Sequence, residues 1–139
     1  MGKISDTELT KIAEAVVNPR QLTEDSDAGG VAAALITDKG NVYSGVCIDT
    51  NSGMGFCAEH SAAAAMITAG ESKIRKIVAV WKNENGDLYI LPPCGRCREF
   101  MSQINGDNLE ADVVLEGKTV KLKELLPYHE WPAPNKVKE

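Results

Sequence analysis

The sequence predicts an α/β protein in which helices pack against one mixed β-sheet. Segments with the apolar repeat of a helix alternate with short β-branched runs typical of strands, in the order α-β-β-α-β-α-β-β. The connections between these segments are short, and no linker or internal repeat divides the 139 residues. With 43% hydrophobic and 25% charged residues, the composition is that of an ordinary globular protein. We therefore expect one domain that spans residues 1–139.

The first predicted helix covers residues 4–17 and begins with a capping signal. Ser5 is a suitable N-cap, and Glu8 follows three residues later, which is the spacing of a capping box. The helix is expected to end at Asn18-Pro19, because proline cannot continue it. The polar stretch TEDSDAGG (23–30) is predicted to be a loop. Apolar residues at helical spacing form one face of the helix: Leu9, Ile12, Ala13 and Val16.

A β-hairpin and a second helix are predicted next. Residues 31–38 have the composition of a buried strand, residues 39–41 that of a turn, and residues 42–49 that of the returning strand. After a loop with two glycines, an alanine-rich helix covers residues 57–69. Gly70 then follows the helix, at the position where glycine easily adopts the left-handed conformation.

The second half of the chain alternates strands with one more helix. A continuous β-branched run at residues 76–81 predicts a central strand, which LYIL (88–91) extends after a turn at Asn85-Gly86. Pro92-Pro93 interrupts regular structure, and a helix then covers residues 94–104. Two short strands and a terminal helical turn complete the fold: ADVVLE (111–116), TVKL (119–122) and KELLP (123–127).

Charge and hydropathy exclude several classes of partner. The formal net charge is −5 and no basic cluster is present, which argues against binding to nucleic acid. No apolar run is long enough to span a bilayer, so we expect no membrane association. The N-terminal MGKISDTELT lacks the apolar core of a signal peptide, which predicts a cytoplasmic protein with reduced thiols. The four cysteines are therefore expected to be metal ligands, catalytic groups or core residues rather than disulfides.

Three of these cysteines occupy positions where a loop enters a helix. Cys94 and Cys97 lie one helical turn apart, so both sulfurs can reach one ion, and Cys57 opens the alanine-rich helix. A helix N-terminus favours the thiolate form of cysteine. Three thiolates on Zn²⁺ leave the fourth position open, as in catalytic zinc sites. Glu59, two residues after Cys57, could then accept a proton from an activated water.

The two cysteine motifs together resemble the signature of the cytidine deaminase superfamily. CAE (57–59) followed by PCGRC (93–97) matches its His- or Cys-x-Glu and later Pro-Cys-x-x-Cys. The all-cysteine form is similar to the small cytidine deaminases and blasticidin-S deaminases, and VAAALITDKGNVYSGVCID (31–49) and ELLP (124–127) extend the similarity over most of the chain. The resemblance implies a three-layer α/β/α fold with a mixed five-stranded sheet, and a homotetramer.

The resemblance also implies a reaction and a set of site residues. The protein is expected to be a zinc-dependent hydrolase that converts a cytosine nucleoside, or an analogue such as blasticidin S, to the uracil form and releases ammonia. Cys57, Cys94 and Cys97 would bind the zinc. Glu59 would take a proton from the water and pass it to the ring nitrogen. The amide of Ala58 would bind the ring carbonyl, and the carbonyl of Pro93 would accept from the amino group.

Several positions depart from the family pattern or are specific to one branch. Cys47 and Asp49 stand where the family usually has an Asn-x-Glu that binds the ribose, so both are expected to contact the substrate. Two alternatives remain open: Cys47 could be a plain core residue, and Asp49 could cap the following loop. His60 replaces an arginine and is expected to support a zinc thiolate. Arg96 is expected to meet an anionic group of the substrate, and Trp131 to line the pocket from the C-terminal segment.

A different class of function uses the same residues. Cys57-x-x-His60 with Cys94-x-x-Cys97 also satisfies the spacing of a structural four-ligand zinc site. That arrangement predicts a non-catalytic binding module whose folding depends on the metal. A redox role for Cys94-x-x-Cys97 is a further alternative, but it leaves Cys57 unexplained. The position of His60 relative to the cysteines therefore separates the enzyme from the zinc-stabilised module.

Overall fold

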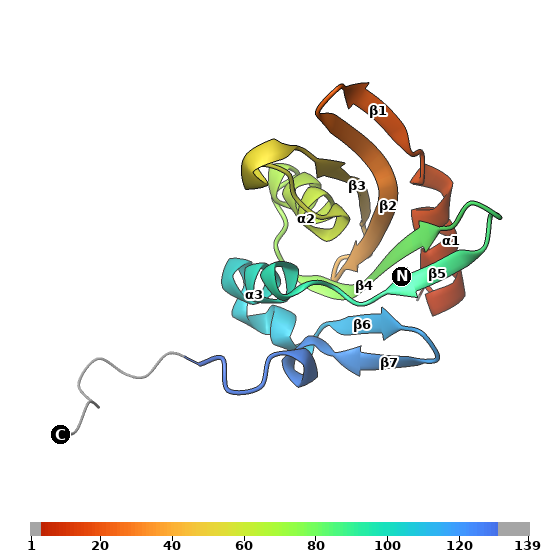
Figure 1. Cartoon of the computed structure of the whole chain (residues 1–139). Coiled ribbons are helices and arrows are strands. Elements are labelled where there is room, and N and C mark those ends of the chain that lie inside the picture. The colour runs from red at the N-terminus through yellow and green to blue at the C-terminus, as the bar shows by residue number, and fades with distance from the viewer. Residues whose placement is uncertain (1–3, 131–139) are drawn as a thin grey trace.

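The computed structural model describes residues 4–130 as three α-helices packed on one β-sheet (Figure 1). No helix among these residues is long and apolar enough to cross a membrane. Two short 3-10 helices, η1 (Asn51–Gly53) and η2 (Gly106–Glu110), lie in connections, and a third, η3 (Leu122–Leu125), follows the last strand. The main elements in chain order are α1 (Asp6–Val16), β1 (Arg20–Thr23), β2 (Ser26–Thr37), β3 (Val42–Asp49), α2 (Ala58–Thr68), β4 (Ile74–Lys82), β5 (Leu88–Leu91), α3 (Gly95–Ile104), β6 (Asp112–Leu115) and β7 (Lys118–Lys121).

The sheet is mixed, as predicted, but it contains seven strands rather than five. Strands β2 and β4 form its antiparallel centre, β4 and β6 run parallel, and β3 and β7 lie at the edges. The two additional strands do not widen the sheet. Strands β1 and β4 pair with different lengths of the same edge of β2. Strands β5 and β6 likewise pair with different lengths of the same edge of β4. Seven strands therefore occupy five positions across the sheet.

The predicted loop at residues 23–30 is wrong, because most of it is a strand. Residues 26–30 begin β2, where Ala28 pairs with Arg20 on one side and with Ile48 on the other. Backbone hydrogen bonds to both neighbours hold this polar segment in the sheet, which side-chain polarity does not reveal. The register to β3 shifts between Ala28 and Ala32, and Gly29 lies there with a φ of +86°.

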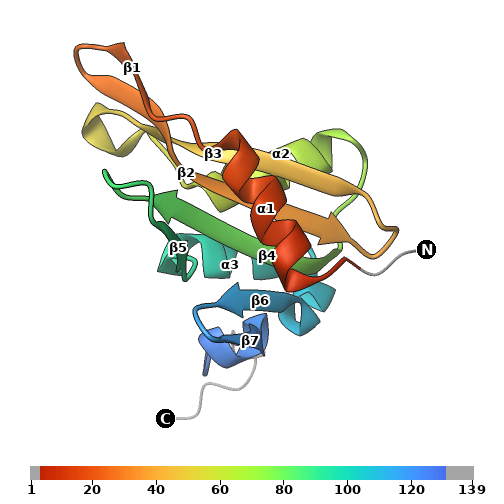
Figure 2. The same ribbon diagram turned by 90° about the vertical axis from the view of Figure 1, so that its right-hand side faces the viewer.

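Helices cover both faces of the sheet and give the expected three layers. Helix α1 lies on one face, and α2 and α3 lie on the other (Figures 1 and 2). Successive residues of the central strands therefore point to alternate cores. The residues that face the core around α2 and α3 are Ala33, Leu35, Ile77 and Ala79, and those that face the core around α1 are Ala32, Ala34, Val78 and Val80.

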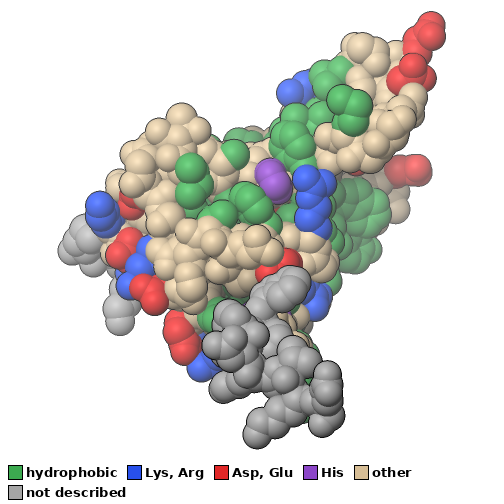
Figure 3. Space-filling model, turned by 90° about the vertical axis from the view of Figure 1, so that its left-hand side faces the viewer, with side chains coloured by type: hydrophobic (Ala, Val, Ile, Leu, Met, Phe, Trp, Pro, Cys, Tyr) green, Lys and Arg blue, Asp and Glu red, His purple; other side chains and the backbone are tan. Residues whose placement is uncertain are grey.

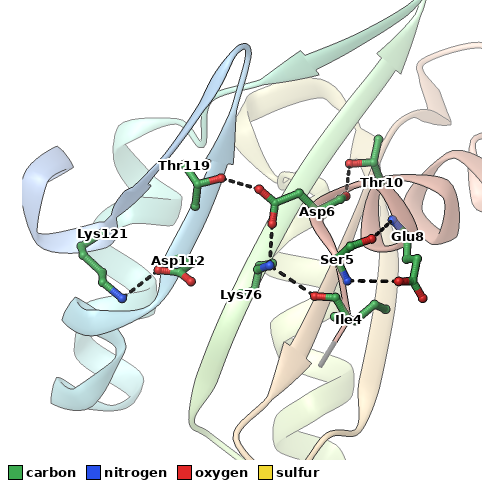
Figure 4. A network of polar contacts seen from close by, with 9 residues as sticks. All are labelled: Ile4, Ser5, Asp6, Glu8, Thr10, Lys76, Asp112, Thr119 and Lys121. Carbon is green, nitrogen blue, oxygen red and sulfur yellow. Dashed lines mark hydrogen bonds and ion pairs between the residues drawn. The ribbon is translucent and has the colours of Figure 1, made fainter. Parts of the chain in front are cut away.

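The start of α1 is tied to the sheet by the polar contacts drawn in Figure 4. The predicted capping box is confirmed: Ser5 Oγ accepts from the Glu8 amide at 3.1 Å, and the Glu8 carboxylate accepts from the Ser5 amide. Asp6 forms an ion pair with Lys76 of β4 and accepts a hydrogen bond from Thr119 of β7. These contacts join the first helix to strands 70 and more residues away in the chain.

The alanine-rich helix α2 packs unusually close to the edge strand β3. A Cβ added to Gly45 of β3 would lie 2.5 Å from the Ala62 amide nitrogen and 2.5 Å from Ser61 Cβ. Ser61 Oγ donates to the Val46 carbonyl at 2.7 Å, which further ties the helix to the strand. Small side chains on both elements permit this approach. The position of the first turn of α2 is thereby set by β3.

Candidate metal and active site

Two helix N-termini bring three thiols together. Cys57 is the N-cap of α2 and Cys94 the N-cap of α3, and neither side chain makes a capping hydrogen bond. Cys97 lies in the first turn of α3 and is fully buried. The three sulfur atoms lie within 4.8 Å of one another, and Cys57 Sγ and Cys94 Sγ are 3.2 Å apart. The structure therefore brings together the three cysteines that the sequence motifs predicted.

The crowding of these thiols shifts their pKa values in opposite directions. Burial and the neighbouring Cys94 raise the pKa of Cys57 to about 11. Burial and the Glu59 carboxylate raise the pKa of Cys97. Burial also acts upward on Cys94, but hydrogen bonds from the Cys97 amide and the Cys57 thiol outweigh it and hold its pKa below the ordinary value. Three adjacent thiolates are costly without a cation between them, and a sulfur-only donor set suits zinc. The residues therefore fit a zinc ion.

Glu59 lies beside the thiols in a cavity of about 380 Å³. Its side chain, on the first turn of α2, is only 5% exposed, and burial raises its pKa. A buried carboxylate with a raised pKa is a suitable proton acceptor and donor. Three segments line the cavity: β2 and β3 (Val31, Cys47 and Asp49), the loop and first turn of α2 (Gly55, Phe56, Cys57, Ala58 and Glu59), and β4 to α3 (Ala79, Leu91, Pro92, Cys94 and Arg96).

The wall formed by β2 and β3 contains two predicted substrate residues. Cys47 and Asp49 both line the cavity, and Cys47 Sγ lies 3.7 Å from Asp49 Oδ2. Cys47 Sγ also accepts from the Val31 amide at 3.3 Å, in the part of β2 where the register to β3 shifts. Cys47 is buried whereas Asp49 is exposed. Cys47 is thus a packing residue and a cavity residue at once.

The wall near α3 differs in one respect from the predicted site. Arg96 lines the cavity, and its Nη1 donates to the Gly55 carbonyl at 3.2 Å. Pro93 is not among the cavity residues, and its carbonyl accepts from Arg98 Nε at 2.8 Å. Leu91 and Pro92 line the cavity in its place. A contact between the Pro93 carbonyl and a substrate amino group stays a prediction.

His60 does not join the cysteines. Its ring stacks on Phe100 at a centroid distance of 4.1 Å and lies 5.2 Å from Phe56. Among residues 4–130, the group able to hold a metal consists of Cys57, Cys94 and Cys97 alone. Burial and the nearby Arg96 lower the pKa of His60, which favours the neutral ring. This arrangement disfavours the four-ligand structural site.

Sequence reasoning missed several cavity residues, and one predicted residue is outside the described chain. Phe56, Val31 and Leu91 are apolar walls of the cavity. Their only signal in the sequence was proximity to a motif residue or to the start of a predicted strand. Trp131 lies outside the described residues 4–130, so its expected place in the pocket stays a prediction.

Comparison with known proteins identifies the family. The model of the cytidine and deoxycytidylate deaminase zinc-binding region matches residues 4–110. The chain belongs to this family. Cytidine deaminase of Mycobacterium tuberculosis is 31% identical over 98 residues, which are 70% of this chain and 69% of that protein. Blasticidin-S deaminase of Bacillus cereus is 32% identical over 129 residues, which are 88% of this chain and 89% of that protein.

Solved structures of the family share the fold. The crystal structure of cytidine deaminase from Mycobacterium leprae superposes with a TM-score of 0.71 at 26% identity, covering 90% of this chain and 99% of that one. Together, the family match and the thiol cluster make this member of the cytidine deaminase family a hydrolytic deaminase acting on cytosine, with zinc as its cofactor. The predicted three-layer fold and family are confirmed.

Proposed function

We propose that this deaminase converts a cytosine nucleoside, such as cytidine or deoxycytidine, or an analogue such as blasticidin S to its uracil form with release of ammonia. The observation that carries the proposal is the buried Glu59 in a cavity that Cys57 and Cys94 also line, with the Cys97 thiol within 4.8 Å of theirs. Cys57, Cys94 and Cys97 are the proposed zinc ligands. A zinc ion bound there supplies Lewis-acid activation of the attacking water.

Glu59 is the proposed proton carrier. Its carboxylate accepts one proton of the water and donates it to the ring nitrogen as the water oxygen bonds to C4 of the ring. The carboxylate then carries the remaining hydroxyl proton to the amino group, and the C4–N bond breaks to release ammonia and leave the C4 carbonyl. Burial favours the neutral form of this side chain, so the carboxylate readily accepts a proton. The position of Glu59 on a helical turn, two residues after Cys57, gives it little freedom to move away from the reacting atoms.

Backbone groups at the cavity can hold the pyrimidine ring. Ala58 is the first residue of α2, where amide groups have no partner inside the helix. Its N–H is therefore free to donate to the ring carbonyl, and Ala58 lines the cavity. The Pro93 carbonyl retains a second lone pair beside the one that Arg98 occupies, which leaves it able to accept from the amino group.

Two residues of opposite charge line the cavity, Asp49 on the wall formed by β2 and β3 and Arg96 on the wall near α3. Arg96 is proposed to meet an anionic group of the substrate, and Asp49 and Cys47 to contact the sugar or its replacement. His60 is proposed to support the thiolates from outside the cavity, and Trp131 to reach the pocket from the C-terminal segment. The blasticidin-S deaminase relative matches a larger share of the chain than the cytidine deaminase relative does.

Ammonia release from a substrate panel tests the proposal. The panel contains cytidine, deoxycytidine, cytosine and blasticidin S, each at several concentrations. We expect turnover of at least one nucleoside or analogue, and loss of turnover in Glu59→Ala with one zinc per chain retained. Activity of Glu59→Ala close to that of the wild type would contradict the proposed proton carrier. No turnover of any panel member would contradict the substrate class.

We further propose that the single domain works as a cytoplasmic homotetramer that does not bind nucleic acid. Three free thiols at one site are best preserved in a reducing compartment. Apolar side chains gather on the face formed by η1, α2 and α3 (Figure 3), where Met54 is 78% and Ile67 is 45% exposed. Light scattering after size exclusion tests the assembly, and a monomer at assay concentration would contradict it.

A further inference from the structure

We propose that Arg98 is a positioning residue of the zinc site, which holds the peptide unit before Cys94 so that its thiol points at the metal. The proposal rests on the proposed ligand set of Cys57, Cys94 and Cys97. Arg98 lies on the first turn of α3 beyond Cys97 and does not line the cavity. It therefore acts through a ligand and not on the substrate.

Cys94 needs such support more than the other two cysteines. Cys97 is fully buried in the core, and Cys57 is half-buried, whereas Cys94 is exposed. Packing therefore restrains the Cys94 side chain least. It is also the N-cap of α3, where the chain turns from an extended segment into the helix and the backbone torsions decide the side-chain direction.

The loop that leads into Cys94 has few hydrogen-bond donors of its own. Pro92 and Pro93 carry no amide hydrogen, so neither can anchor the loop through its backbone nitrogen. The Pro93 carbonyl is held instead by a side chain, Arg98 Nε, at 2.8 Å. Because the peptide unit is planar, fixing the Pro93 carbonyl also fixes the direction of the Cys94 nitrogen and its Cα.

Arg98 holds Cys94 from both sides. Its backbone amide donates to the Cys94 carbonyl at 3.0 Å, and its side chain donates to the preceding Pro93 carbonyl. Both peptide units that flank the Cys94 Cα are thus tied to one residue. Its Nη1 also donates to the Leu125 carbonyl at 3.4 Å, which links the guanidinium to η3, whose Leu122 is fully buried in the core. The guanidinium is therefore itself held in place.

Arg96, which also lies on α3, makes a similar contact to the loop before Cys57. Arg96 Nη1 donates to the Gly55 carbonyl, two residues before Cys57. Arg96 and Arg98 thus each donate to a backbone carbonyl in a loop that leads to a cysteine of the proposed zinc site. Only Arg98 does so away from the cavity, so its substitution changes the ligand geometry without removing a group that faces the substrate.

Zinc affinity and cobalt spectra of Arg98 variants test the proposal. Arg98→Met keeps the length and apolar stem of the side chain but removes every donor. Its zinc affinity, from chelator competition, is expected to fall about 10- to 100-fold, the usual effect of losing a residue that orients a metal ligand. In the Co²⁺-substituted protein, the ligand-field bands should shift. Arg98→Lys, which keeps the positive charge and offers a single donor nitrogen, should recover part of the affinity.

Arg20→Met is the matched control, because exposed Arg20 also donates from Nη1 to a backbone carbonyl, that of Asn18, at 3.1 Å. It should leave zinc affinity unchanged. Zinc affinity of Arg98→Met within twofold of the wild type, with the same cobalt spectrum, would overturn the proposal even if the metal-free protein melted at a lower temperature. Should Arg98→Met not fold, Arg98→Gln replaces it under the same criterion.

The same titration distinguishes this proposal from the ligand set on which it rests. Wild type should bind one zinc per chain, and Cys94→Ser should bind it much more weakly. Failure of both expectations would overturn the ligand set itself. If both hold while Arg98→Met behaves as the wild type, only the role of Arg98 is wrong.

Discussion

Adding one methyl group at Gly45 should displace helix α2, which bears the proposed proton carrier Glu59. In Gly45→Ala, the new Cβ would lie 2.5 Å from Ser61 Cβ and from the Ala62 amide nitrogen, whereas ordinary contact begins at 3.4 Å. Helix α2 and strand β3 must then separate by about 0.9 Å, the difference between these distances. Gly45 has no positive φ, so the backbone tolerates alanine and the penalty is steric.

The size of the effect follows from that displacement. Overpacking of this kind costs about 1–3 kcal/mol of unfolding free energy. Cys57 is the N-cap of α2 and Glu59 lies in its first turn, so both are within four residues of Ser61 at the contact. A misplacement of about 1 Å at reacting groups costs on the order of 100-fold in rate. We therefore expect kcat to fall by one to two orders of magnitude while zinc is retained.

Ammonia release and urea denaturation measure the two effects separately. Gly30→Ala is the matched control, because it adds the same methyl group to β2, the strand that pairs with β3. A Cβ at Gly30 meets no atom within 4 Å. The reasoning would be refuted by a Gly45→Ala protein that keeps the kcat of the wild type, or by one that loses no more activity than Gly30→Ala.

Three further predictions concern stability and the metal. The fully buried Asn108 side chain accepts a hydrogen bond from the Ile74 amide at 2.7 Å and donates to two backbone carbonyls. Asn108→Ala should therefore lower the unfolding free energy, measured by urea denaturation, by about 2–4 kcal/mol. A loss below about 1 kcal/mol would contradict this expectation. Hydrogen bonds from Lys76 and Thr119 lower the pKa of Asp6 below its ordinary value of 3.8, so this contact stabilises the fold above that pH and its contribution is lost as the pH falls through the lowered value. Asp6→Asn should remove that part of the acid dependence, and an unchanged acid transition would show the reasoning to be wrong. His60→Ala should retain one zinc per chain by metal analysis, because His60 stacks on Phe100 and is not in the metal-binding group; loss of the zinc would favour a fourth ligand.

Local signals in the sequence determined most of the helix boundaries and the three cysteines that converge in the structure. The capping box of Ser5 and Glu8 depends on residues three apart, and both hydrogen bonds form as expected. Gly70 follows α2 with a φ of +94°, the conformation that ends a helix. The cysteines are found from spacing alone, because a metal site needs particular ligand atoms in a fixed pattern.

The tertiary structure decided what depends on neighbours distant in the chain. Residues 26–30 contain a serine, an aspartate and two glycines, yet they belong to a strand because β1 and β3 pair with it on both sides. His60 could have closed the metal site by its spacing, but Phe100 on α3 stacks on its ring and keeps it outside. The hydrogen bond of Arg98 to the Pro93 carbonyl likewise depends on how the loop before α3 folds back on the helix. Such contacts depend on how separate elements pack, so local sequence patterns do not specify them.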